Sequence, residues 1–67
     1  MITIEVNGEQ RRIAPGSTIS QLLEALGVRA PLLVVEHNQR ILKREEYSSV
    51  QLNEGDTVEI VHFVGGG

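Results

Sequence analysis

The chain has no cysteine and no tryptophan, and it contains one tyrosine and one phenylalanine. The lack of cysteine excludes a disulfide framework, a thiolate metal site and a cysteine nucleophile. The scarcity of aromatic side chains removes the platforms on which the bases of single-stranded nucleic acids stack. The fold and function must therefore be built from aliphatic packing, turns and ordinary polar groups.

Positive charge is also scarce: lysine and arginine together number 6, they are scattered along the chain, and the formal net charge is -3. A nucleic-acid-binding surface needs a concentrated positive face, so we expect no nucleic-acid partner. No apolar run approaches membrane-spanning length, and the chain starts directly with a strand pattern instead of a targeting segment. We therefore expect no membrane partner and a cytoplasmic location, which the lack of cysteine also fits.

The length of 67 residues leaves room for one domain, which buries only about 60% of its unfolded surface. Residues 2–6 alternate apolar and polar and are followed by Asn7-Gly8, a strong hairpin signal. Residues 9–13 should return antiparallel, and Arg11 then faces the same side as the apolar residues of the first strand. This pattern predicts an opening hairpin.

The next segment has apolar residues at helical spacing: Ile19, Leu22, Leu23 and Leu26. Thr18 is the expected N-cap, and Gln21 three residues later completes a capping box. Gly27 stands where a left-handed C-cap residue belongs. The sequence therefore predicts one short helix between the hairpin and the rest of the chain.

Three further segments resemble strands: residues 30–37, a short return at 40–42, and residues 57–64, which have high β propensity throughout. Between them we expect an irregular or 3₁₀ segment anchored by Tyr47, and a brief strand near Leu52. The order predicts an α+β protein of the β-grasp class, with a mixed four- to five-stranded sheet, one main helix on one face, and the last strand parallel to the first. Residues 1–64 should form this domain and residues 65–67 a flexible glycine tail.

Strand parity predicts which side chains face away from the helix. Early residues of the last strand should face inward, which leaves Val61 and Phe63 on the outer face, where Val34 of a neighbouring strand should join them. With Val64 at the base of the tail, these residues form the expected docking face, because exposed apolar patches tend to mark interfaces.

The glycines Gly65, Gly66 and Gly67 suit a segment that enters a channel too narrow for a Cβ atom. The α-carboxylate of Gly67 is ionised at neutral pH and is therefore a poor electrophile. To react it must first be activated, most simply as an acyl-adenylate formed with ATP. The residues alone leave open whether the tail does this or is a disordered terminus.

The segments "GSTISQLLEALG", "VVEHNQRILKREEY" and "LNEGDTVEIVHFV", together with the terminal glycine pair, resemble the ThiS family of ubiquitin-like sulfur carriers in thiamine biosynthesis. The resemblance implies that Gly67 is adenylated by a ThiF-type enzyme and converted to a thiocarboxylate with sulfur from a cysteine desulfurase relay. Thiazole synthase (ThiG-type) would then take the sulfur. Gly65 and Gly66 would thread the partners' channels, and the protein itself would bind no cofactor.

Other functions stay open. The small subunit of molybdopterin synthase has the same fold and the same terminal chemistry, and a carrier for tRNA thiolation or another sulfur-bearing metabolite is a further alternative. Ubiquitin-like protein tagging would instead place Gly67 in an isopeptide bond. A plain interaction module is a different class, and it would keep its role without the last two glycines. A stand-alone enzyme is not indicated, because no residue pattern marks a catalytic site. His37 and His62 are far apart in sequence and are expected at the surface or a strand edge, not in a metal site.

Overall fold

The structure is a computed structural model that describes residues 1–29 and 32–63. Its first two strands, β1 (Ile2–Val6) and β2 (Glu9–Ile13), form the expected antiparallel hairpin. Asn7 and Gly8 both have positive φ, at 48° and 82°, which is the requirement of a type I′ turn. The hairpin prediction is confirmed, including the facing of Arg11, which lies opposite Ile4.

The helix α1 (Ile19–Leu26) begins and ends at the predicted caps. The Thr18 hydroxyl accepts a hydrogen bond from the Gln21 N–H at 3.2 Å, and the Gln21 side chain accepts one from the Thr18 N–H at 2.9 Å. Gly27 closes the helix in the left-handed conformation at φ 72°. Its N–H donates to the last turn of the helix, so both ends of α1 have partners for their free backbone groups.

The second half of the chain contains β3 (Leu32–His37), β4 (Arg40–Ile41), the 3₁₀ turn η1 (Arg44–Glu46) and β5 (Thr57–Phe63). Tyr47 is buried after η1, as predicted. The brief strand expected near Leu52 is reduced to an isolated bridge between Thr18 and Gln51. This segment is hydrogen-bonded to the loop before α1, because the Leu52 N–H donates to the Ser17 carbonyl at 2.8 Å. It therefore does not pair with a strand of the sheet.

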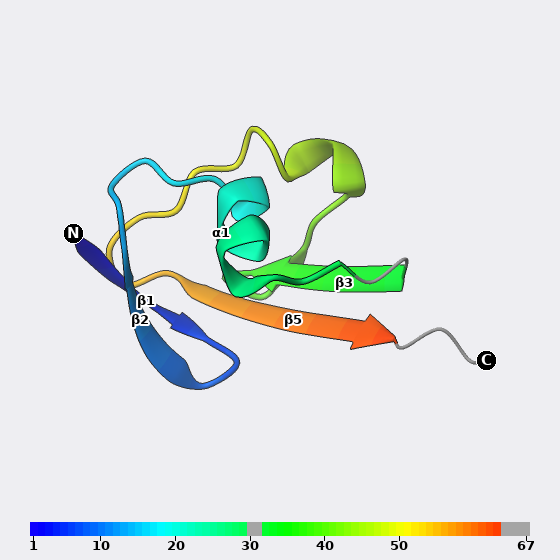
Figure 1. The fold of residues 1–67 in the computed structure, drawn as a ribbon, viewed down its shortest axis with the longest axis horizontal. Coiled ribbons are helices and arrows are strands. Elements are labelled where there is room, and N and C mark those ends of the chain that lie inside the picture. Colours follow the sequence, from blue (N-terminus) through cyan, green and yellow to red (C-terminus); the bar gives the residue numbers. More distant parts are fainter. Residues whose placement is uncertain (30–31, 64–67) are drawn as a thin grey trace.

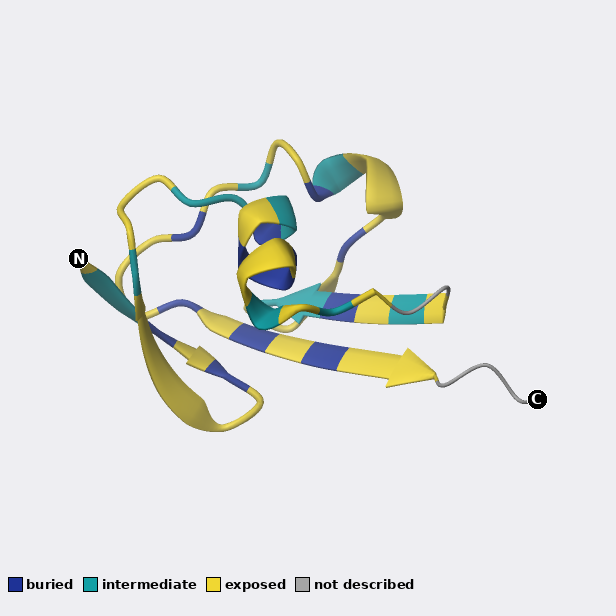
Figure 2. Ribbon diagram, viewed as in Figure 1, coloured by how far each residue is buried: buried dark blue, intermediate teal, exposed yellow. Residues whose placement is uncertain are grey.

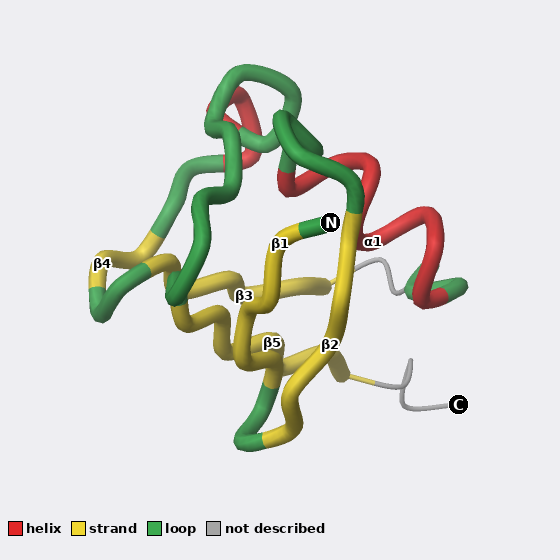
Figure 3. Tube along the Cα trace, turned by 90° about the vertical axis from the view of Figure 1, so that its left-hand side faces the viewer, coloured by secondary structure: helices red, strands yellow, loops and turns green. Residues whose placement is uncertain are grey.

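The strands form one mixed sheet in the order β2-β1-β5-β3-β4. β5, the last strand in the chain, lies in the middle: it is parallel to β1 and antiparallel to β3. The helix covers one face of this sheet, and in the turned view the strands lie to one side and α1 to the other (Figures 1 and 3). The other face carries no helix in the described part of the chain, so it is open to solvent.

The core lies between α1 and the sheet. Figure 2 shows the alternation of buried and exposed residues along β5 that a strand with one covered face produces. The buried hydrophobic residues come from nearly every element: Ile4, Val6, Ile19, Leu22, Leu23, Val35, Leu42, Tyr47, Leu52, Val58 and Ile60. Because most of these side chains are aliphatic, the core is filled by branched residues rather than by aromatic ones.

A polar cluster joins the end of β3 to the turn before β5. His37 Nε2 donates to Asp56 Oδ2 at 2.7 Å, and the amide of Asn38 donates to the other carboxylate oxygen at 3.2 Å. The backbone N–H of Asn53 also donates to Asp56, at 2.9 Å. His37 is therefore not a free surface residue but part of a partly buried network that fixes two chain segments together.

Candidate docking face at the end of the last strand

The central strand β5 leads toward the C-terminal glycines. It is held on both sides by backbone pairing, to β1 at Thr57 and Val58 and to β3 along its whole length. Val64, Gly65, Gly66 and Gly67 lie outside the residues that the structure describes, so the roles expected for them stay predictions. The structure describes the strand itself up to Phe63.

The open face of the sheet carries a strip of apolar side chains at this end of β5. Val34 and Val61 are direct cross-strand partners, and Leu32 pairs with Phe63 in the same way. Val61 and Phe63 are each about half exposed, at 50% and 51%. We call these four residues, Leu32, Val34, Val61 and Phe63, the outer apolar strip. The predicted placement of Val34, Val61 and Phe63 on one exposed face is confirmed.

Leu32 was missed by sequence reasoning, although it is the most exposed member of the strip, at 63%. Its parity is that of Val34, two residues along, so alternation places both on the same face. The signal was therefore present in the sequence. What the sequence alone lacked was the register, which brings Leu32 opposite Phe63 and joins the two strands into one patch.

Negative charge borders the strip. Glu36 and Glu59 are direct cross-strand partners on the open face, and Glu5 lies on the next strand, opposite Thr57. Like charges placed directly opposite destabilise a sheet. None of these carboxylates has an ion-pair partner within residues 1–29 and 32–63. The open face thus combines an apolar end with an acidic middle, which fits a partner surface that is apolar and basic.

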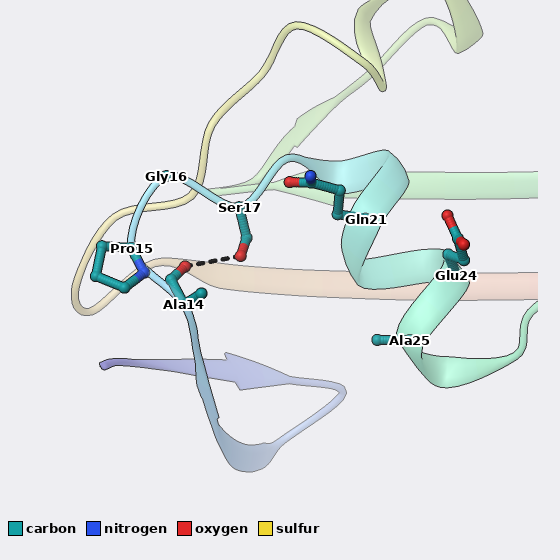
Figure 4. Close-up of a pocket in the computed structure, with 7 residues that line it drawn as sticks. All are labelled: Ala14, Pro15, Gly16, Ser17, Gln21, Glu24 and Ala25. Carbon is teal, nitrogen blue, oxygen red and sulfur yellow. Dashed lines mark hydrogen bonds between the residues drawn. The ribbon is translucent and has the colours of Figure 1, made fainter.

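Residues 1–29 and 32–63 contain no group of three or more His, Asp or Glu side chains that could hold a metal ion. No helix in these ranges is long and apolar enough to cross a membrane. The largest hollow, about 560 Å³, is a shallow groove between the Ala14–Ser17 loop and α1 (Figure 4). In it the Ser17 hydroxyl already donates to the Ala14 carbonyl at 2.7 Å.

A mixed sheet with its last strand in the centre, one helix across one face, and an exposed apolar strip on the other defines a ubiquitin-like β-grasp protein. The particular family follows from the sequence itself. The profile of the ThiS family matches residues 4–67. The chain belongs to the ThiS family.

Relatives and solved structures agree with this assignment. The chain is 44% identical over 50 residues to the sulfur carrier protein ThiS of Bacillus subtilis, covering 75% of this chain and 76% of that one. The crystal structure of a thiamine biosynthesis protein (ThiS) from Geobacter metallireducens superposes with a TM-score of 0.84 at 35% identity, over 98% of this chain and 100% of that one.

Two larger proteins also match. A thiazole synthase of Paramagnetospirillum magneticum is 42% identical over 62 residues, which is 92% of this chain, and one of Magnetococcus marinus is 41% identical over 64 residues, or 96%. The chain spans only 19% and 20% of the length of these two relatives. A ThiS-like segment therefore occurs there within a much longer protein.

Proposed function

We propose that this protein carries sulfur for thiazole formation in thiamine biosynthesis, as a thiocarboxylate on Gly67. Membership of the ThiS family is the observation that carries the proposal, and a relative of similar length bears the name sulfur carrier protein. The fold supports it physically. The described residues form a small rigid body whose central strand leads into the segment that ends in three glycines.

The chemistry proceeds in two displacements. A carboxylate oxygen of Gly67 attacks the α-phosphorus of ATP and releases pyrophosphate, which leaves an acyl-adenylate. A cysteine desulfurase relay carries its sulfur as a persulfide, and a thiol reduces this persulfide to hydrosulfide while a disulfide forms. The hydrosulfide attacks the carbonyl carbon of the adenylate and AMP departs, which leaves the thiocarboxylate. The partner enzyme binds the ATP, and the carrier supplies only the reacting group. Gly65 and Gly66, which lack a Cβ atom, suit passage into a narrow catalytic channel.

The outer apolar strip is the proposed docking face for the ThiF-type adenylating enzyme. Its four side chains are apolar and exposed, and they end directly before the tail that must enter the enzyme. The carboxylates of Glu36 and Glu59 beside the strip favour a partner with basic residues around an apolar patch. A carrier held by this face presents its tail in a fixed direction.

Thiazole synthase is the proposed acceptor of the sulfur. The two long relatives named thiazole synthase contain a segment similar to this chain, which supports a functional link between carrier and synthase. In this proposal the protein is not an enzyme but a co-substrate, consumed and regenerated in each cycle. Its location in the cytoplasm, with these partners, is part of the same proposal.

The test is the intact mass of the carrier after incubation with ATP, an adenylating enzyme of the ThiF type and sulfide. The expected product has one oxygen of the carrier replaced by sulfur, and a variant lacking Gly66 and Gly67 should show no such change. Addition of thiazole synthase and its small substrates should return the mass to its starting value. An unmodified mass in the complete mixture would overturn the proposal. Transfer of sulfur only to a tRNA or to a pterin precursor would show a sulfur carrier that serves another pathway than thiamine biosynthesis.

A further inference from the structure

Three hollows adjoin one another on the helix-covered side, since neighbouring hollows share lining residues. The largest lies beside the Ala14–Ser17 loop and reaches Ala25 (Figure 4). A second, of about 300 Å³, shares Ala25 and continues along β2 to Leu26. A third, of about 210 Å³, shares Arg11 and Leu26 with the second and extends to His62 on β5. We call these three adjoining hollows the α1–β2 furrow.

The strand beside the furrow has a free edge. β2 is the first strand in the sheet order, and within residues 1–29 and 32–63 it pairs with β1 alone. The two-residue type I′ turn makes Val6 and Glu9 a hydrogen-bonded pair, and such pairs alternate along an antiparallel ladder. The backbone N–H and C=O groups of Gln10 and Arg12 therefore point away from β1. An unpaired edge of this kind is a template for another strand.

Beside Ile13 the helix wall of the furrow is apolar, and β2 carries two arginines, Arg11 on the helix-covered face and Arg12 on the open face. Leu22, Ala25 and Leu26 of α1 face Ile13 of β2, and Leu26 and Ile13 are only partly buried although they pack against the core. Arg11 and Arg12 are both exposed on β2, and neither has an ion-pair partner within the described ranges. Acidic residues stand toward the ends of the furrow, at Glu9 and Glu24.

We propose that the α1–β2 furrow binds an extended segment of a second protein, which adds to β2 as a strand. Apolar side chains at alternate positions of that segment face α1, because a strand has a period of two. Acidic side chains between them face Arg12, which lies on the open face of the sheet opposite Thr3. β2 is separated from β5 by β1, so this site leaves the outer apolar strip free.

The test uses a short capped peptide of alternating valine and glutamate as the probe, and the same peptide with lysine in place of glutamate as the control. Binding is followed by amide resonances and amide hydrogen exchange of the full chain. The Val/Glu peptide should shift the Gln10 and Arg12 amides and slow their exchange, and the Val/Lys peptide should bind several-fold more weakly. No ATP or sulfur donor is present, so failure here leaves the sulfur-carrier proposal untouched.

Variants separate strand addition from general attraction. Gln10→Pro removes an outward N–H that β1 does not use and should abolish binding. Arg12→Glu should weaken it roughly fivefold, whereas Arg29→Glu, the same charge change outside the furrow, should leave it unchanged. Should Gln10→Pro not fold, Ala25→Gln fills the furrow from an exposed helix position and should also weaken binding. Equal binding of both peptides, shifts confined to the outer apolar strip, or no shift at millimolar peptide would each overturn the proposal.

Discussion

At the scale of single residues, Asp56 is the one charged residue that is buried in the described chain. Burial of the carboxyl group on its own raises the pKa of Asp56, but hydrogen bonds from His37, the Asn53 N–H and Asn38 together outweigh it and hold the pKa below its ordinary value of 3.8. A pKa that is lower in the folded than in the unfolded state stabilises the fold above that ordinary value. The contribution is then lost as the pH falls through the folded-state pKa.

We therefore predict that Asp56→Asn lowers the free energy of unfolding at neutral pH by about 2 kcal/mol, since hydrogen bonds to a charged group are lost or weakened. The loss of stability on acidification below about pH 4 should also become shallower. Urea denaturation at a series of pH values measures both. Glu45→Gln is the matched control, because Glu45 is exposed and should alter neither quantity. Parallel acid profiles for Asp56→Asn and the natural chain would contradict this account.

Residue-scale contacts also mark the limit of sequence reasoning. Asn7 was predicted as a turn residue, which it is, but its side chain does more. Its carbonyl oxygen accepts from the Ile60 N–H at 2.7 Å, and its amide donates to the Ile60 carbonyl at 3.1 Å. In this way Asn7 continues the pairing of β1 with β5 beyond the end of β1. No local pattern reveals a contact between residues 53 positions apart.

At the scale of elements, local sequence signals were sufficient to predict the hairpin and the helix. Asn7-Gly8 fixed the hairpin, and the spacing of Thr18, Gln21 and Gly27 fixed both ends of α1. These patterns act within a few residues, so they can be read without tertiary structure. The segment near Leu52 behaved differently: its apolar residues suggested a strand, but its hydrogen-bond partners are Ser17, just before α1, and Ile19, the first residue of α1. Which element a short apolar segment packs on is decided by the whole fold.

The capping box of α1 leads to a second prediction. Thr18→Ala should lower the free energy of unfolding by about 1 kcal/mol, because the Gln21 N–H loses its acceptor. Ser20→Ala, inside the helix and without a hydrogen bond from its side chain in the described chain, should be neutral or slightly stabilising. Denaturation in urea distinguishes the two. Equal effects would mean that the cap contributes nothing beyond helix propensity.

At the scale of the whole molecule, the sequence predicted the layers, the parallel placement of the last strand beside the first, and three members of the outer apolar strip. The acidic pair of Glu36 and Glu59 could not be predicted, because it depends on the register between β3 and β5. The α1–β2 furrow arises from the packing of α1 against the hairpin and has no signature in the sequence. The shape of a surface formed by two elements depends on the distance between them. The residue pattern of either element alone carries no information about that distance.

The proposed docking face gives a third prediction, at this scale. Val61→Arg should lower kcat/KM for adenylation of the carrier about tenfold or more, since a central apolar contact is replaced by a charge that a basic partner repels. Ile41→Arg, an equivalent exposed change beside Glu36 on the same face, should have a much smaller effect. Pyrophosphate release at varied carrier concentration provides the measurement, with thermal unfolding of both variants as a check on folding. Similar losses for the two variants would argue against the strip as the docking face.

The central position of β5 has a consequence for protein synthesis. Until β5 leaves the ribosome, the β1–β2 hairpin and the β3–β4 pair have no strand to join them, so a nascent or prematurely terminated chain stays open to proteases. Contacts between distant segments form late and slowly in such a topology. A copy with a complete sheet has therefore already produced the strand that leads into the C-terminal glycines.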